Sequence, residues 1–259
     1  VRHLCYCFTP MRYAWTFSDE YFGRGGLRRR ALAPLLAALR AWDRRTAQEV
    51  DRFVAISYHV AERIRRHYGR ESDVVHPPVD IARCTPPPNG SGGRGGYDLI
   101  VSALVPYKRI DLAVDCHSRR GWPLKIVGVG GCARALAARA APCVELLGWR
   151  SDEDVLALYR NCRLLLFPGE EDFGIVPLEA QACGRPVVAF GRGGALETVV
   201  PDVTGVFFPE QTESALADAV GRAAARRWDS GAIRAHAETF APQRFLEGLA
   251  GSLGRLLRA

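Results

Sequence analysis

Six short apolar segments recur at nearly even spacing after residue 97, and this rhythm constrains the fold more than any other feature of the chain. They cover residues 98–103, 124–127, 144–147, 164–167, 186–190 and 205–208. Helical patterns lie between them, for example over residues 110–118 and 153–160. Strands that alternate with helices in this way are typical of a parallel sheet covered by helices on both faces. The sequence therefore predicts an α/β fold, with a Rossmann-like domain over residues 97–240.

The loop after the fourth apolar segment combines three acidic residues, 170–172, with a helix that we expect to open at Pro177. The start of a helix favours an anion, above all phosphate, and Gly174 would let a ligand approach the backbone closely. Carboxylates, in contrast, bind hydroxyl groups. A nucleotide-sugar carries both phosphates and hydroxyls and would satisfy both features. The alternative is a solvated acidic loop before a helix whose early Glu179 supports the cap.

Glu171 and Glu179 are separated by seven residues in the run E-D-F-G-I-V-P-L-E. This run, with the following G-R-P-V-V-A and G-G-A-L-E-T-V, resembles the E-x7-E donor site of the retaining family-4 glycosyltransferases, which have the two-domain GT-B fold. The resemblance implies that Glu171 holds hydroxyls of the donor sugar and that Glu179 holds the ribose. It also implies that the backbone N–H groups of Gly174, Ile175 and Val176 cradle phosphate or sugar, and it makes the preceding Phe173 a donor-binding candidate.

A second loop, after the segment 98–103, contains Lys108 and Arg109. Lys108 is a point cation suited to phosphate, and the resemblance assigns it to the charge that develops on the leaving diphosphate. The family usually has G-R-L-x-x-x-K at this place, whereas this chain has S-A-L-V-P-Y-K. One of two expected cations is therefore missing, and Arg109 is the candidate to compensate. An exposed lysine at a helix start is the plain alternative for Lys108.

Two more loops are expected at the same edge of the sheet. Residues 128–133 match G-x-G-x-x-A, the dinucleotide fingerprint, so an NAD-dependent enzyme stays open as an alternative. The nearest acid, Glu145, is closer than that fingerprint requires, and the family has a glycine-rich turn here, which makes Gly128 and Gly130 donor-binding candidates. Trp149 follows the third segment, where the family borders the nucleotide base.

Residues 1–80 have a different pattern, with expected strands at 3–6 and 52–56, a helix at 27–50 and a helix at 59–68 capped by Ser57. The run C-F-T-P-M-R-Y-A-W resembles a stretch of a bacterial mannosyltransferase-like subgroup, with Phe8 in place of the usual histidine. An aromatic core cluster is the alternative for this run. The subgroup resemblance makes GDP-mannose the expected donor.

Four domains or segments follow from these patterns. Residues 1–80 resemble the last part of an acceptor domain, which suggests a chain truncated at its N-terminus. Residues 81–96 read as a flexible Pro- and Gly-rich linker, and residues 97–240 as the donor domain. Residues 241–259 form an expected helix that crosses back to the first domain, with a stripe of Phe245, Leu249, Leu253 and Leu256. A split transferase, completed by another chain, and a donor-binding module without catalysis remain open.

The net charge and the sequence motifs indicate which classes of binding partner to expect. Lys and Arg outnumber Asp and Glu by 35 to 28, and residues 1–80 hold 14 arginines against nine acids, a net +5. A positive surface suits anionic lipid or a phosphorylated acceptor, so we expect a glycan or lipid-linked acceptor and consider peripheral contact with an anionic membrane. No nucleic-acid motif and no C-x2-C pair is present. We therefore expect no nucleic-acid partner, no zinc site, and reduced cysteines in a cytoplasmic protein. The family resemblance further implies sugar transfer in polysaccharide biosynthesis without a metal and without a cofactor besides the donor.

Overall fold

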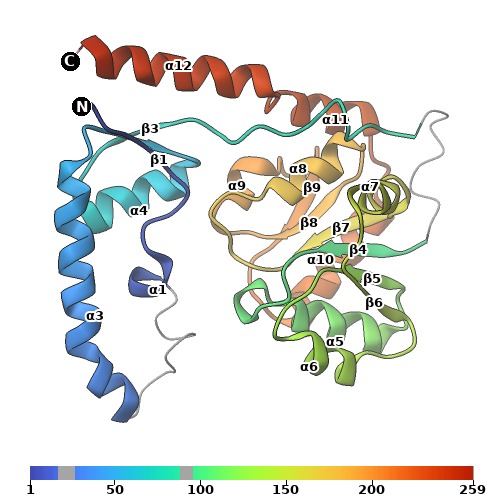
Figure 1. The fold of residues 1–259 in the computed structure, drawn as a ribbon. Coiled ribbons are helices and arrows are strands. Elements are labelled where there is room, and N and C mark those ends of the chain that lie inside the picture. Colours follow the sequence, from blue (N-terminus) through green and yellow to red (C-terminus); the bar gives the residue numbers. More distant parts are fainter. Residues whose placement is uncertain (17–26, 88–95, 259) are drawn as a thin grey trace. The chain divides into compact units, whose positions relative to one another are not determined.

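The computed structural model describes residues 1–16, 27–87 and 96–258, and the chain divides into two compact units (Figure 1). Unit 1 comprises residues 1–77 together with 243–259, and unit 2 comprises residues 78–242. The C-terminal helix thus belongs to the same unit as the N-terminal segment. Within the described ranges, no helix has the length and apolar character needed to cross a membrane.

Unit 1 is built on a parallel three-stranded sheet in the order β1-β2-β3. Its strands are β1 (Leu4–Cys7), β2 (Arg52–Ala55) and β3 (Ser72–Val74). Its helices are α1 (Arg12–Trp15), α3 (Leu27–Thr46), the 3-10 turn η1 (Ala47–Glu49), α4 (Tyr58–Tyr68) and α12 (Pro242–Arg258). The predicted cap of α4 is confirmed, because the hydroxyl of Ser57 accepts a hydrogen bond from the backbone N–H of Val60 at 3.0 Å.

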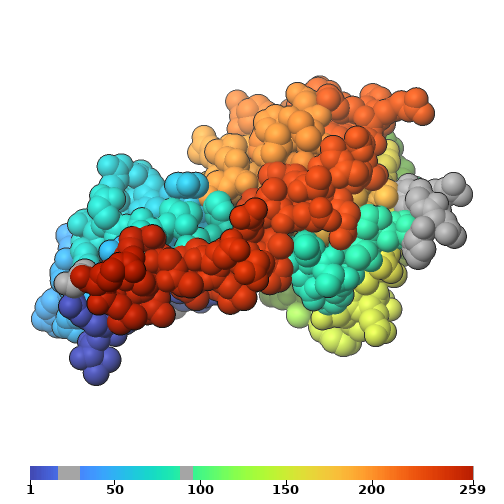
Figure 2. Space-filling model, turned by 90° about the horizontal axis from the view of Figure 1, so that it is seen from above, coloured from blue at the N-terminus to red at the C-terminus, as the bar shows by residue number. Residues whose placement is uncertain are grey.

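Two predicted apolar stripes are only partly buried in unit 1. On α3, Leu36 is buried, but Leu35 and Trp42 are 62% and 49% exposed. On α12, the C-terminal helix drawn in red in Figure 2, Ser252 is buried where Leu253 was expected, and Leu253 is 46% exposed. Leu256 is buried as predicted, and Arg255, one turn from Ser252, forms an ion pair with Asp73 of β3 at 3.0 Å.

Unit 2 contains a parallel six-stranded sheet in the order β6-β5-β4-β7-β8-β9. Its strands are β4 (Asp98–Val101), β5 (Leu124–Val127), β6 (Val144–Gly148), β7 (Leu164–Phe167), β8 (Val187–Phe190) and β9 (Gly205–Phe208). All six predicted strands are present, and β5, β7 and β9 have the predicted bounds. Strand β7 is buried along its whole length, as a strand covered on both faces requires.

Helices cover both faces of this sheet (Figure 1). One layer contains α5 (Ile110–Arg120), α6 (Ala133–Arg139) and α10 (Glu213–Ala225). The other contains α7 (Asp152–Asn161), α8 (Ile175–Ala182) and α11 (Ser230–Glu238). The short helices η2 (Pro106–Lys108) and α9 (Ala195–Thr198) lie in loops. The predicted α/β fold with a doubly covered parallel sheet is therefore confirmed.

The prediction of a flexible linker at residues 81–96 is wrong for residues 81–87. Residues 88–95 lie outside the described ranges. Residues 81–87 are part of unit 2, and side chains of two of its helices hold them in place. Arg234 of α11 donates from one nitrogen to the carbonyls of Cys84 and Ala182, at 2.9 and 2.7 Å. Arg160 of α7 donates to the carbonyl of Thr85 at 2.8 Å. The Pro- and Gly-rich composition predicted a flexible segment. It could not reveal these contacts, because the arginines that make them lie 75 and 150 residues away in the sequence.

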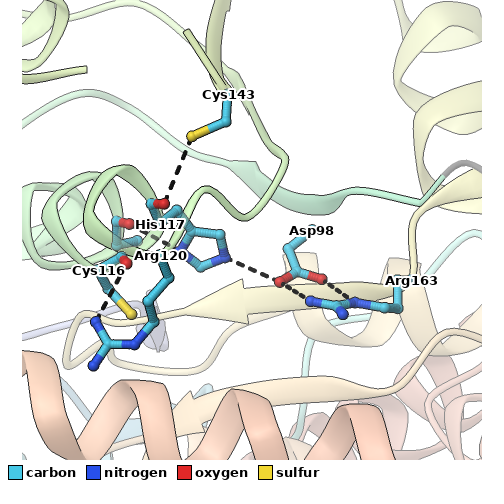
Figure 3. Close-up of polar contacts among 7 residues, drawn as sticks. Asp98, Cys116, His117, Arg120, Cys143 and Arg163 are labelled. Atoms are coloured by element: carbon cyan, nitrogen blue, oxygen red, sulfur yellow. Dashed lines mark hydrogen bonds and ion pairs between the residues drawn. The ribbon is translucent and has the colours of Figure 1, made fainter. Parts of the chain in front are cut away.

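A buried polar cluster joins β4, α5 and β7 at the amino ends of the two strands (Figure 3). The Asp98 carboxylate accepts two hydrogen bonds from Arg163, at 2.9 and 2.8 Å. The Nε2 of His117 lies 3.0 Å from the same carboxylate, and its Nδ1 lies 2.9 Å from the carbonyl of Ala113. Both Asp98 and His117 are fully buried. The cluster fixes the neighbouring strands β4 and β7 at the end opposite their outgoing loops.

Candidate functional site

The chain reverses its winding direction between β4 and β7. Strands β4, β5 and β6 follow one another toward one edge of the sheet, and β7, β8 and β9 toward the other. The loops that leave the carboxyl ends of β4 and β7 therefore diverge to opposite faces. A crevice forms at such a switch point, and ligands of open α/β sheets bind there.

Lys108 and Glu171 meet at this switch point, from the loops after β4 and β7. The ammonium of Lys108 forms an ion pair with Oε2 of Glu171, and the two side chains are only 14% and 21% exposed. Lys108 is also 5.2 Å from the centre of the Tyr107 ring. Gly169 allows the two loops to approach, since a Cβ at this position would lie 2.8 Å from the Cα of Lys108. The structure thus brings both predicted catalytic candidates into contact.

The turn at residues 193–194 holds the acidic loop in place. The N–H of Gly194 donates to the carbonyl of Glu171 at 2.8 Å. A Cβ on Gly194 would lie 2.5 Å from the nitrogen of Phe173, so only glycine fits against the loop. Phe173 itself is buried, with its ring 6.0 Å from that of Phe240. The ring of Phe173 therefore packs inside the protein, and the donor-binding role of this residue stays a prediction.

Helix α8 begins at Ile175, two residues before the predicted start at Pro177. Gly174 is its N-cap residue, with φ 102 and ψ 69, a conformation that favours glycine. Ile175 is exposed at the helix start, and Val176 is half-buried. The first-turn N–H groups of a helix have no partner inside the helix, so the stretch after Gly174 presents donors suited to an anion.

Glu179 is the fifth residue of α8, and its partners differ from those of Glu171. The hydroxyl of Tyr159 on α7 donates to its Oε2 at 2.8 Å, and a guanidinium nitrogen of Arg83 lies 3.7 Å from its Oε1. Burial raises the pKa of Glu179, while the Tyr159 hydrogen bond and the charge of Arg83 act in the opposite direction. The two glutamates of the motif therefore have separate surroundings.

Arg109 does not join the Lys108–Glu171 pair. Its guanidinium contacts Gln211 at 3.2 Å and Asp111 at 3.4 Å. Gln211 in turn donates to the carbonyl of Pro168 at 2.9 Å. The side chain of Arg109 thus links the β4 loop to the loop after β9 and to the start of the β7 loop.

Gly128 and Gly130 are required by the packing of their loop against the β4 loop. They have φ values of 136 and 158, which L side chains rarely adopt. A Cβ at Gly128 would overlap the carbonyl oxygen of Ser102, and one at Gly130 would lie 2.7 Å from the carbonyl carbon of Leu104. Backbone packing therefore explains both glycines without a dinucleotide. Trp149, after β6, is 73% exposed and is accessible to a stacking partner.

Sequence reasoning missed Arg83, Tyr159 and Gln211, which contact predicted site residues. Arg83 and Gln211 lie in loops, where no periodic pattern marks them. Tyr159 lies on α7, and its spacing resembles that of an ordinary core residue. Tyr159 lies 20 residues from its partner Glu179 in the sequence, and Gln211 lies 102 residues from its partner Arg109. Only the fold brings these residues together.

Comparison with known proteins shows the family to which the chain belongs. Residues 97–226 match the family described as "Glycosyl transferases group 1", and residues 9–83 match "Glycosyltransferase Family 4". The D-inositol 3-phosphate glycosyltransferase of Mycobacteroides abscessus is 30% identical over 235 residues, which cover 82% of this chain and 51% of the relative. An uncharacterized glycosyltransferase of Methanocaldococcus jannaschii is 31% identical over 119 residues, 44% of this chain and 34% of the relative. The chain thus spans about half the length, or less, of these relatives.

Solved structures share the fold. Anabaena HepE in complex with UDP and glucose superposes with a TM-score of 0.71 at 21% identity, covering 83% of this chain and 66% of that one. The lipopolysaccharide outer core galactosyltransferase WaaB superposes with a TM-score of 0.67 at 21% identity, covering 80% and 62%. At this level of identity the likeness shows the fold alone.

Proposed function

Because the chain belongs to the glycosyl transferases group 1 family, we propose that it acts in the transfer of a sugar from a nucleotide-sugar donor with retained anomeric configuration. The observation that carries the proposal is the Lys108–Glu171 ion pair at the switch point of the unit 2 sheet. A cation for phosphate and a carboxylate for hydroxyls stand side by side there, as a nucleotide-sugar requires.

Each residue has a separate role in this proposal. Lys108 stabilises the charge that develops on the leaving diphosphate, with help from the start of α8 and without a metal ion. Glu171 accepts hydrogen bonds from the donor sugar, and Glu179 accepts them from the ribose. Trp149 borders the base. Since Lys108 is paired in the free protein, the donor must offer Glu171 hydroxyl groups in exchange for the ammonium.

GDP-mannose is the donor that we propose first, because the run C-F-T-P-M-R-Y-A-W resembles a mannosyltransferase-like subgroup. A UDP-sugar is the second candidate, since HepE has been solved in complex with UDP and with UDP-glucose. Titration of the chain with GDP-mannose, UDP-glucose and NADH discriminates among these donors and the NAD-dependent alternative. Tight binding of NADH with no binding of either nucleotide-sugar would refute the proposal.

The test of the roles is a pair of variants measured with two ligands. Glu179→Ala should weaken GDP and GDP-mannose alike, because the ribose is common to both. Glu171→Ala should weaken GDP-mannose and leave GDP nearly unchanged, because only the former carries the sugar. Glu247→Ala, an exposed residue of α12 in unit 1, is the control. Calorimetry gives the six affinities, and equal losses of the two ligands in both Glu179→Ala and Glu171→Ala would show the assignment to be wrong.

The acceptor is proposed to be a glycan or a lipid-linked molecule at the cytoplasmic face of an anionic membrane. A stripe on α3 supports this, since exposed residues recur at spacings of three and four along one helix face. The stripe consists of Ala31, Leu35, Ala38, Trp42 and Arg45. Apolar residues beside arginines suit the interface of anionic lipid.

Vesicle sedimentation tests the stripe. The protein should sediment with vesicles that contain phosphatidylglycerol, and Trp42→Glu should reduce the bound fraction several-fold, by removing apolar burial and adding repulsion. Leu246→Glu, at an exposed position of α12, is the matched control. Equal binding of the two variants would mean that the α3 stripe does not face lipid.

A further inference from the structure

The carboxylate of Glu179 is held by groups from two elements outside its own helix. Tyr159, fully buried on α7, donates its hydroxyl to Oε2 at 2.8 Å. Arg83, from the segment that precedes residues 88–95, lies 3.7 Å from Oε1 through one nitrogen and 2.6 Å from Asp152 through the other. The two partners therefore act on different oxygens of one carboxylate.

The two contacts differ in kind. The Tyr159 contact is a hydrogen bond of ordinary length and fixes Oε2. The Arg83 contact is too long for a hydrogen bond, and Asp152 anchors the guanidinium in its position. Across the described residues, no hydrogen bond is found to Oε1 of Glu179. Arg83 thus supplies positive charge beside Oε1 and leaves that oxygen able to accept a hydroxyl.

Several other titratable or charged groups face Glu179. They are Asp80 and Cys84 from the segment of Arg83 and Asp152 from α7, while Cys183 at the end of α8 acts on Tyr159. Burial, Asp152 and Asp80 all raise the pKa of Glu179, whereas Tyr159 and Arg83 lower it. Without the latter two groups, a carboxyl in this place would bind a proton at a higher pH and could then donate as well as accept.

We propose that Arg83 and Tyr159 are positioning residues, which hold Glu179 as a carboxylate with Oε1 turned to accept a ligand hydroxyl. The ligand part of this inference rests on the proposed function, in which the hydroxyl belongs to the ribose. The control of the Glu179 charge by its two neighbours does not depend on that function, because it concerns the free protein.

The first experiment measures the free protein. The side-chain carboxyl carbon of Glu179 is followed by NMR between pH 4 and 9 in protein labelled with ¹³C-glutamate, and Glu179→Gln identifies the signal. Arg83→Met and Tyr159→Phe should each move the titration midpoint to higher pH, and Arg83→Lys should restore it. Arg222→Met, which removes an arginine that pairs with Asp218 on α10, should not change it. Unchanged midpoints in both Arg83→Met and Tyr159→Phe would overturn the proposal.

The second experiment measures GDP affinity of the same variants against pH. Affinity should fall by up to about tenfold for each pH unit below the midpoint, so the profile of Arg83→Met should shift by the same amount as its NMR midpoint. If the midpoints move but Glu179→Gln binds GDP normally, the proposed ribose contact is wrong and the control of the Glu179 charge stands. If Glu179→Gln no longer binds GDP, but the dependence of GDP affinity on pH is the same in the Arg83 and Tyr159 variants as in the unmodified protein, the positioning role is wrong.

Discussion

Replacing Asp98 by asparagine should lower the free energy of unfolding of unit 2 by about 3 kcal/mol, because it removes the charge at the centre of the buried cluster. Asp98 accepts two hydrogen bonds from Arg163 and faces His117 at 3.0 Å. Breaking one partner of a buried charge network costs about 3–5 kcal/mol. The lower end applies because Arg163 is 37% exposed and can turn to water, whereas His117 is fully buried.

Thermal unfolding followed by circular dichroism gives the comparison. For a unit of this size, 3 kcal/mol corresponds to a fall in Tm of roughly 6–12 °C. Hydrogen exchange of peptides from β4 and β7 assigns the loss to unit 2, since the two units need not unfold together. The matched control is Asp218→Asn, whose carboxylate is 68% exposed and pairs with Arg222 along one helix. That variant should lose less than about 0.5 kcal/mol. Similar losses in the two variants would refute the reasoning.

Two further predictions concern the loops of the site. Lys108→Ala should weaken GDP by roughly 10- to 150-fold in calorimetry, because a hydrogen bond to a charged group is worth about 1.5–3 kcal/mol. Lys125→Ala, at the other lysine of the chain, should leave the affinity unchanged, and a Lys108 variant that behaves like it would remove Lys108 from the site. Gly128→Ala should destabilise unit 2 by about 3 kcal/mol or more, since the new Cβ would overlap Ser102 and the backbone would be strained. Gly131→Ala, where a Cβ meets open space, should be nearly neutral in the same denaturant titration.

The sheet of unit 2 could be predicted because each of its strands is a short apolar run bounded by loop residues. Strand β7 is the clearest case, since residues 164–167 are apolar throughout and the strand is buried on both faces. The position of the ligand-binding loops could be predicted as well, because ligands of parallel sheets bind beyond the carboxyl ends of the strands. That rule placed Lys108 and Glu171 at one edge, and the structure joins them.

The remaining features depend on contacts that no local pattern contains. Helix α8 begins at Ile175 because Gly174 adopts a conformation that favours glycine, whereas the sequence rule for proline pointed to Pro177. Residues 81–87 are ordered by Arg160 and Arg234, which lie at least 75 residues away in the sequence. Both cases involve backbone groups whose partners are set by the fold.

The junction between β4 and β7 has a mechanical consequence. These strands share two aligned residue pairs, Asp98 with Leu164 and Leu99 with Leu165, whereas β4 and β5 share four. The six-stranded sheet is therefore two half-sheets joined by a short seam, which the buried cluster braces at one end only. A ligand bound by the loops of Lys108 and Glu171 would connect the two strands at their carboxyl ends. Opening of the seam would then require ligand release first, so binding should slow amide exchange along the full length of β4 and β7.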